Sequence, residues 1–304
     1  MASDNDDYDY DEDDDYDYDD DYDDLDIPEN FVILDPDDLL VQGLLLVNYP
    51  QARIGRASEE TNIRRFRLSY GCVPRAVVAL WEDLQTTTIV EAFLPPEQRR
   101  VKFLLMALYQ LRKYPTEADR EKTFDISQAY SRRWVWLFIR KIQALKDQKI
   151  LWPDDCPDIW VCSVDGTHVW VHEVAHEEFS LDPEYFSHKH NKSGLTFELG
   201  VSLREQRLLW VNGGFKAGRN DKQIFVEEGL RDLLSASGKR AIGDSGYEGY
   251  HEVSIPNSID RRNVRKFKTR ALKRHEKVNG YLKVFDCLKG RFRHSPDQLT
   301  ECFE

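Results

Sequence analysis

Apolar positions recur with two different periods along the chain, and the change falls near residue 150. Before it, apolar residues follow the i, i+3, i+4, i+7 spacing of amphipathic helices. This spacing predicts helices beginning at Pro74 and near Val101, a short charged helix over 114–124 and a longer helix over 125–145. Residues 53–150 are therefore expected to form one helical domain. The apolar runs in residues 27–52 predict a linker or a short helix that packs on the body.

From Trp160 onward the pattern changes to strands. Strands are predicted for "WVCSVDGTHVWV" and for residues 195–203 and 207–215. A helix is predicted for 221–236 and a short strand for 240–247, and the basic run 261–292 is expected to be helical in its second half. Three strands, a helix, a strand and a later helix indicate a mixed α/β fold for residues 151–304.

Asp165 lies in the middle of the first predicted strand, where a carboxylate is costly to bury unless something binds it. Asp244 follows the fourth predicted strand, and Glu276 lies on the late helix. Two-metal phosphoryl chemistry needs carboxylates that converge from different elements, and oxygen ligands of this kind suit Mg²⁺ or Mn²⁺. The three acids are therefore candidate ligands of two divalent cations. The alternative for each acid alone is a solvated side chain or turn chemistry in "DGT" and "DSG".

Four segments, "SVDGTHVWV", "GRNDKQIF", "AIGDSGYEGY" and "RHEKVNGYLKVFDCLKGRFRH", resemble the DDE motifs of PIF/Harbinger-type transposases. The resemblance covers roughly residues 100–304. It implies a ribonuclease-H-like catalytic domain, divalent metal ions, cut-and-paste DNA transposition and action in the nucleus. Asp165 matches the first aspartate of the family and Glu276 its terminal glutamate, while Lys283 supplies the lysine that follows.

The second aspartate has two candidates. Asp221 matches the aspartate of a "GS-x-x-D" segment of the family, although the residues before it are Gly218-Arg219-Asn220, where many members carry a glycine-serine pair. Asp244 matches another aspartate motif. The predicted topology favours Asp244, because Asp221 precedes the helix and Asp244 follows the next strand. Asp221 is then expected to be a fourth acid of the site, near enough to bind metal or to position DNA.

The formal net charge of −13 is an average over two unlike parts. Residues 1–26 hold 16 Asp or Glu and no Lys or Arg, and the remaining chain has 42 basic against 39 acidic residues. The acidic Asp/Tyr repeats are expected to be disordered, because like charges repel and aliphatic residues are few. They would act as a solvating tail, or as a nucleic-acid mimic that folds back on a basic surface and weakens nonspecific DNA contacts.

The body of the chain is basic in two places. From Arg53 to Lys149 there are 19 Lys or Arg and 11 Asp or Glu, and the short helix before a long one is typical of a helix-turn-helix. Nine Lys or Arg lie between Arg261 and Lys277, a run that also resembles a nuclear localisation signal. Solvated helix faces are the alternative. The candidate DNA-contacting residues are Arg132, Arg133, Arg140, Lys141, Lys189, Arg270, Lys273, Arg274 and Lys283.

The histidines and cysteines suggest no further metal centre. His168 lies three residues after Asp165, so strand alternation points it to the opposite face. His188 and His190 stand in a polar basic loop without a second pair at zinc spacing. Five cysteines without a C-x-x-C pair suit reduced thiols. The acidic N-terminus does not read as a signal peptide, and no apolar stretch is long enough to predict a membrane span.

These observations predict a metal-dependent nuclease and strand transferase of a DNA transposon. Its partners would be double-stranded DNA at the element ends and at the target, a separate DNA-binding accessory protein in some family members, and further copies of the chain when active. One alternative is a host-recruited, catalytically silent DNA-binding protein. Another is a defective or truncated element copy, because the chain ends at "SPDQLTECFE", where a helix is expected to start.

Overall fold

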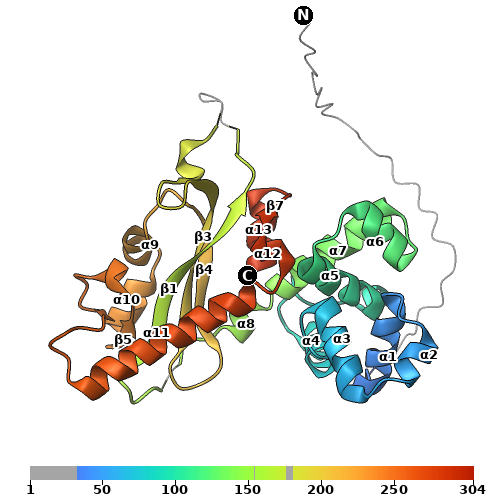
Figure 1. The fold of residues 1–304 in the computed structure, drawn as a ribbon, viewed down its shortest axis with the longest axis horizontal. Helices are drawn as coiled ribbons and strands as arrows, with labels where there is room; N and C mark the ends of the chain where they lie inside the picture. The colour runs from blue at the N-terminus through green and yellow to red at the C-terminus, as the bar shows by residue number, and fades with distance from the viewer. Residues whose placement is uncertain (1–32, 154, 176–180) are drawn as a thin grey trace, which may run out of the picture.

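The computed structural model describes residues 33–153, 155–175 and 181–304. The prediction made for residues 1–26 falls outside them. Within the described residues, a helical lobe is followed by a lobe built on a β-sheet (Figure 1). The helical lobe contains α1 (Pro36–Leu46), α2 (Gln51–Gly55), α3 (Glu59–Tyr70), α4 (Pro74–Thr86), α5 (Val101–Lys113), α6 (Glu117–Phe124), α7 (Gln128–Gln143) and α8 (Lys146–Lys149).

Local sequence signals set several of these helix ends. Pro74 occupies the first turn of α4, where its missing N–H costs nothing. The Ser58 side chain accepts a hydrogen bond from the Thr61 N–H and caps α3, which ends at Gly71 with a φ of 84°. The four helices predicted between residues 74 and 145 are therefore confirmed. Helix α1 packs into the same core as α3, α4 and α5.

The second lobe contains the sheet and the later helices. Its strands are β1 (Trp160–Val171), β2 (Phe186–Ser187), β3 (Lys192–Ser202), β4 (Leu208–Lys216), β5 (Arg240–Ile242), β6 (Val253–Ser254) and β7 (Arg291–Phe292). Its helices are α9 (Asp221–Glu227), α10 (Leu230–Ala236), α11 (Arg262–Leu282), α12 (Asp286–Lys289) and α13 (Pro296–Phe303). The structure is thus a mixed α/β fold preceded by a helical region.

The strand order is β4-β3-β1-β5-β6, with β2 also pairing to β3 and β7 to β1. Strands β1, β3 and β4 pair antiparallel, and Asp165 stands opposite Leu199. Strands β5 and β6 run parallel to β1. The antiparallel strand β3 and its partner β4 therefore lie on one side of β1, and β5 and β7 pair with β1 in parallel on the other.

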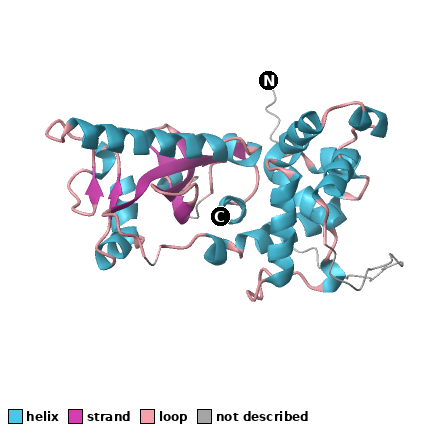
Figure 2. Cartoon of the chain, turned by 90° about the horizontal axis from the view of Figure 1, so that it is seen from below, coloured by secondary structure: helices cyan, strands magenta, loops and turns pink. Residues whose placement is uncertain are grey.

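Helices cover both faces of the sheet (Figure 2). Alternate residues of β1 point to opposite faces. Ser163 faces α11, where its hydroxyl lies 3.0 Å from His275 Nδ1. Cys162 and Val164 face the other way and join a buried cluster with Phe225 and Leu230 of α9 and α10. A second core cluster runs from the helical lobe to the far end of β1 and to α13, so the two lobes share packed side chains.

The structure differs from the predicted elements in three places. The strand predicted over 240–247 covers only Arg240–Ile242 and is followed by a short 3-10 turn over Ser245–Tyr247. The helix predicted over 221–236 is two helices, broken where Gly229 takes a φ of 102°. The helix of the basic run begins at Arg262, earlier than predicted, and passes through Gly280. Its buried face is made of Lys268, Ala271 and His275, so hydrophobic periodicity gives no sign of its first half. In the described part of the chain, none of the helices has the length and apolarity that crossing a bilayer requires.

Candidate active site

Asp165 and Asp244 come together where the parallel pairing of β1 with β5 stops, although β1 itself continues to Val171. The last residues that β1 and β5 pair with each other are Ser163 and Ile242, and each aspartate lies two residues further along. Asp165 Oδ1 accepts a hydrogen bond of 2.9 Å from the Gly166 N–H. Asp244 precedes a short turn, and its side chain accepts a hydrogen bond of 2.8 Å from the Gly246 N–H. Both carboxylates thus occupy the edge where the parallel strands separate.

Asp221 reaches the same edge from α9. It is the first residue of that helix, whose end is capped by the Asn220 side chain. A Cβ atom placed on Gly166 would lie 2.6 Å from Asp221 Oδ1, so the carboxylate lies directly against the residue after Asp165. The missing side chain at Gly166 therefore leaves the space that this carboxylate occupies.

The electrostatics of the three aspartates reflect this proximity. Burial raises the pKa of Asp165 to about 6, and repulsion from Asp244 and Asp221 adds to the effect. Burial also raises the pKa of Asp221, which Asp244 raises further, whereas Lys189 acts in the opposite direction. Ionised carboxylates at this edge are therefore destabilised by one another, which is a common feature of sites that bind cations or carry out acid–base chemistry.

Helix α11 contributes an asparagine to this group. Asn279 Nδ2 donates a hydrogen bond of 3.3 Å to Asp165 Oδ2. The His275–Ser163 contact lies one turn earlier on the same face of the helix and is buried. Glu276, the predicted terminal glutamate, is exposed beside this face, and it is Asn279 that reaches Asp165. The structure thus brings Asp165, Asp221 and Asp244 together and leaves the Glu276 side chain in solvent.

Two predicted DNA-contacting lysines lie near the carboxylates. Lys189 is exposed in the loop between β2 and β3, and its charge lowers the pKa of both Asp165 and Asp221. Lys283 follows α11 and donates hydrogen bonds from Nζ to the carbonyl oxygens of His168 and Leu288. Burial lowers its pKa to about 8. Lys189 is therefore available to an incoming anion, whereas Lys283 already has backbone partners.

The predicted DNA-contacting residues of α7 are mostly engaged within the fold. Arg132 forms an ion pair of 2.6 Å with Glu117, and Arg140 lies 4.0 Å from a carboxylate oxygen of Glu301. Lys141 is buried and donates a hydrogen bond of 2.6 Å to the Phe93 carbonyl. Arg133 is exposed.

Among the predicted DNA-contacting residues of α11, some side chains are exposed and one is bonded within the protein. Arg270 and Lys273 are exposed, whereas Arg274 donates hydrogen bonds to the backbone carbonyls of Leu203 and Glu205.

His168 points to the sheet face opposite the Asp165 side chain, in agreement with the strand alternation. Its Nδ1 is 2.8 Å from Thr196 Oγ1, and burial lowers its pKa to about 4. Its ring stacks on Trp170 and packs near His190, with centroid distances of 5.7 and 4.8 Å. The three rings form an aromatic group on the sheet face opposite the Asp165 side chain.

Glu198 is an acid of this region that the sequence analysis missed. It lies on β3 opposite Gly166, is 1% exposed, and accepts a hydrogen bond of 3.0 Å from the Trp210 indole N–H. Burial raises its pKa to about 8, and Asp221 adds to this. Its other carboxylate oxygen is buried without a hydrogen-bond partner among the described residues. The signal was available, because Glu198 interrupts the apolar run "LTFELGVSL" as Asp165 interrupts its own strand.

The donor atoms at the strand ends have the chemistry that a hard divalent cation requires. They are carboxylate oxygens on three different elements, and a cation would relieve the repulsion that raises the pKa of Asp165. Within the described ranges, no three His, Cys, Asp or Glu side chains are close enough together to hold a metal ion as they stand. Binding of a cation would therefore require these side chains to turn toward one another.

The second lobe is similar to one known family. Residues 164–304 match the family model described as DDE superfamily endonuclease. The matched region begins within β1, one residue before Asp165, and includes Asp221, Asp244 and Glu276. A search of curated proteins finds no match to this chain. The family match indicates a transposase-like nuclease.

Proposed function

We propose that the chain is a metal-dependent DNA endonuclease and strand transferase of a cut-and-paste DNA transposon, of the PIF/Harbinger type. The observation that carries this proposal is the meeting of Asp165 and Asp244 two residues beyond the last paired positions of β1 and β5. The similarity of residues 164–304 to DDE superfamily endonucleases supports the same reaction class.

The strand order supports a ribonuclease-H-like catalytic domain. An antiparallel unit of β4, β3 and β1 continues into β5 and β6, which run parallel to β1, and helices cover both faces. In open sheets with parallel strands, sites form at the carboxyl ends of the strands. Asp244 follows the carboxyl end of β5, and Asp165 lies beside it within β1, two residues beyond the last pairing of β1 with β5.

Asp165 and Asp244 are proposed to hold Mg²⁺ or Mn²⁺, with Asp221 assisting and Glu276 turning in from α11. Two divalent cations bound there would supply the charge that activates the attacking oxygen and stabilises the leaving oxygen of a phosphodiester. Asn279 fixes the orientation of the Asp165 carboxylate through its hydrogen bond of 3.3 Å. Lys189, exposed beside the aspartates, positions the scissile phosphate.

DNA is proposed to lie along the exposed cations of α11, with Arg133 adding a contact from α7. Arg132, Arg140 and Lys141 contribute less, because each already has a partner within the protein. The helix-turn-helix role of α6 and α7 therefore remains a proposal that rests on their order and charge. Nuclear action, an accessory DNA-binding protein and an oligomer of this chain belong to the same proposal.

Cleavage of terminal-repeat DNA in Mg²⁺ tests the assignment. Asp165→Asn, Asp244→Asn and Glu276→Gln are each expected to lower the cleavage rate at least about a hundredfold, as removal of a group that stabilises transition-state charge does. The cleavage rate of Asp221→Asn measures how much Asp221, the fourth acid, contributes to catalysis. Asp232→Asn, which changes an exposed aspartate of α10, is the matched control. Undiminished cleavage in the first three variants would contradict the metal assignment.

A catalytically silent DNA-binding protein is the second candidate function. The exposed position of Glu276 favours it, since no third carboxylate from α11 joins the aspartates in the described residues. Calorimetry with Mg²⁺ and with duplex DNA separates the two functions. DNA binding without any Mg²⁺ binding supports the silent protein, whereas binding of both supports the nuclease.

A further inference from the structure

Helix α11 presents a row of cations to solvent. Its seven exposed basic residues, counting the residue that caps it, are Arg261, Arg262, Arg265, Lys266, Arg270, Lys273 and Lys277. Within the part of the chain that the structure describes, no ion pair joins any of the seven to an acidic residue. We call these seven residues the α11 cation row. Their charges repel one another, so an anionic partner would stabilise this surface.

The cation row is not needed to hold α11 on the body. Lys268, on the buried face of the helix, forms an ion pair of 3.0 Å with Asp260. Arg274 donates hydrogen bonds to two backbone carbonyls, and His275 contacts Ser163. Binding of another molecule to the exposed cations would therefore break no ion pair within the described residues.

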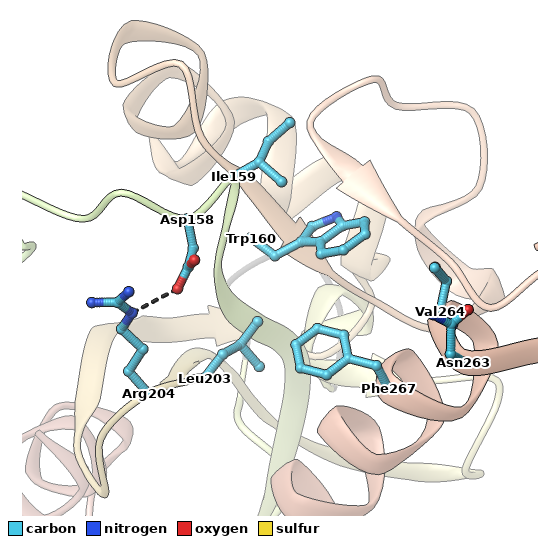
Figure 3. Close-up of a pocket in the computed structure, with 8 residues that line it drawn as sticks. All are labelled: Asp158, Ile159, Trp160, Leu203, Arg204, Asn263, Val264 and Phe267. Carbon is cyan, nitrogen blue, oxygen red and sulfur yellow. Dashed lines mark hydrogen bonds and ion pairs between the residues drawn. The ribbon is translucent and has the colours of Figure 1, made fainter. Parts of the chain in front are cut away.

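An open pocket with aromatic walls lies beside the first half of α11 (Figure 3). It has a volume of about 460 Å³ and is lined by Asp158, Ile159, Trp160, Leu203, Arg204, Asn263, Val264 and Phe267. The rings of Trp160 and Phe267 lie side by side, with centroids 5.8 Å apart. Phe267 is 43% exposed although it is a large apolar residue. An exposed aromatic ring of this kind can pack against another aromatic side chain.

Residues 1–26 of this chain have the matching chemistry. They contain 16 Asp or Glu and no basic residue, and five tyrosines are spaced among the acids. We propose that this segment binds the α11 cation row, with its carboxylates against the row and a tyrosine ring against Trp160 and Phe267. The contact is intramolecular, and residues 1–26 are the proposed ligand of the surface formed by the α11 cation row and the pocket.

The length of the chain permits this contact. Tyr22 is 11 residues from Ile33, the first described residue, and can lie up to about 35 Å from it, whereas Asp4 can reach about 100 Å. The radius of gyration expected for a compact chain of this length is about 19 Å. Because the segment is tethered, its effective concentration at the row is on the order of millimolar, and even weak pairing is populated.

The contact has a consequence that rests on the proposed function. DNA phosphates and the acidic segment would compete for the same cations, so the segment weakens binding to duplexes that lack specific contacts. A specific site, which adds contacts elsewhere on the protein, would displace it. The segment thereby favours selective over nonspecific DNA binding.

Carbodiimide crosslinking of the full-length chain tests the contact without DNA. The reagent joins carboxylates to lysines that touch them, and mass spectrometry identifies the joined residues. Crosslinks from residues 1–26 are expected at Lys266, Lys273 or Lys277, with protein concentration leaving the yield unchanged. The triple variant Arg262→Gln, Arg265→Gln, Arg270→Gln keeps these lysines and is expected to lower the yield about tenfold.

Two further variants make the test specific. The control variant Arg64→Gln, Arg67→Gln, Arg75→Gln removes three exposed arginines of the helical lobe and is expected to leave the crosslinks unchanged. Phe267→Ala, which removes one wall of the pocket, is expected to lower the yield about threefold, and an unchanged yield overturns the tyrosine contact. Absence of crosslinks at α11 overturns the proposal as a whole. An equal loss of crosslinking yield in the α11 triple variant and in the helical-lobe control variant does the same.

A DNA-binding measurement tests whether DNA and residues 1–26 compete for the α11 cation row. Replacing the aspartates of residues 1–26 by asparagine is expected to tighten binding of a random duplex about tenfold at low salt. The same replacement in the α11 triple variant is expected to have little effect, and an equal gain there overturns the competition. The crosslinking result does not depend on nuclease activity, so failure of the proposed function and failure of this contact are distinguishable.

Discussion

Gly166 and Asp221 are in such close contact that a Cβ atom on the glycine would lie 2.6 Å from the aspartate Oδ1. The backbone of Gly166 is ordinary strand, so an alanine would not be strained there. Its methyl group would instead turn the Asp221 carboxylate away from Asp165. Gly166→Ala is therefore expected to lower Mg²⁺-dependent cleavage about tenfold or more while changing the free energy of unfolding by less than about 1 kcal/mol.

This variant separates the two candidates for the second aspartate, because it changes no carboxylate. If Asp244 alone partners Asp165, Gly166→Ala retains the cleavage rate of the wild type. Gly280→Ala provides the control, since a Cβ atom there meets nothing within 4 Å. Thermal unfolding of each variant, measured alongside cleavage, excludes loss of fold as the cause.

The raised pKa of Asp165 predicts a pH-dependent stability. Its folded-state pKa of about 6 exceeds the ordinary value of 3.8, so the folded protein binds more protons between these values. Stability from this group is present below pH 4 and is lost as the pH rises to about 6. Asp165→Asn is therefore expected to stabilise the metal-free protein at pH 7 by on the order of 2 kcal/mol, with no difference at pH 3.5.

Mg²⁺ provides the matching control for that measurement. A cation held by Asp165 stabilises the wild type and leaves the asparagine variant unchanged, so the difference in melting temperature is expected to shrink as Mg²⁺ is added. An advantage of the variant that is the same at pH 3.5 and pH 7 would contradict the role of repulsion and burial.

Glu198 predicts a second pH-dependent effect at higher pH. Its pKa of about 8 lies above the ordinary value of 4.5, so the stability contributed by this group is lost as the pH rises from about 4.5 to about 8. Glu198→Gln keeps an acceptor for the Trp210 N–H and is expected to remove this loss. Glu198→Ala leaves that N–H buried without its partner and is expected to cost about 2 kcal/mol at pH 7. Urea unfolding between pH 6 and 9 measures both effects, and parallel curves for wild type and Glu198→Gln would contradict the assignment.

The exposed cations of α11 predict a specific salt dependence of DNA binding. Replacing Arg262, Arg265 and Arg270 by glutamine is expected to reduce the slope of log affinity against log salt by about 3, if each contacts a phosphate. Arg132→Gln is expected to change the slope little, because its guanidinium already pairs with Glu117 at 2.6 Å. Fluorescence anisotropy with a labelled duplex measures the slope, and equal effects of the two changes would contradict the assignment of DNA to α11.

The sequence predicted much of the α/β lobe because alternation and turn residues are local properties. The strand over Trp160–Val171 and the short strand before Asp244 are both present, and the helix between them is present with a break. The break at Gly229 followed from a left-handed residue that periodicity does not register. The early start of α11 was missed for a related reason, since its buried face carries the polar residues Lys268 and His275, whose partners lie outside the helix.

The sequence by itself determined that Asp165 lies in an apolar strand, where burial of its carboxylate costs free energy. It also determined that acidic and basic residues are separated along the chain. Tertiary structure alone decided which acids meet. Asp244 lies beside Asp165 because β5 pairs parallel to β1, and Asp221 joins them because Gly166 leaves room for its carboxylate. It also decided that Glu198 is buried and Glu276 exposed. Burial and distance between residues far apart in sequence depend on strand pairing and helix packing, which no local pattern encodes.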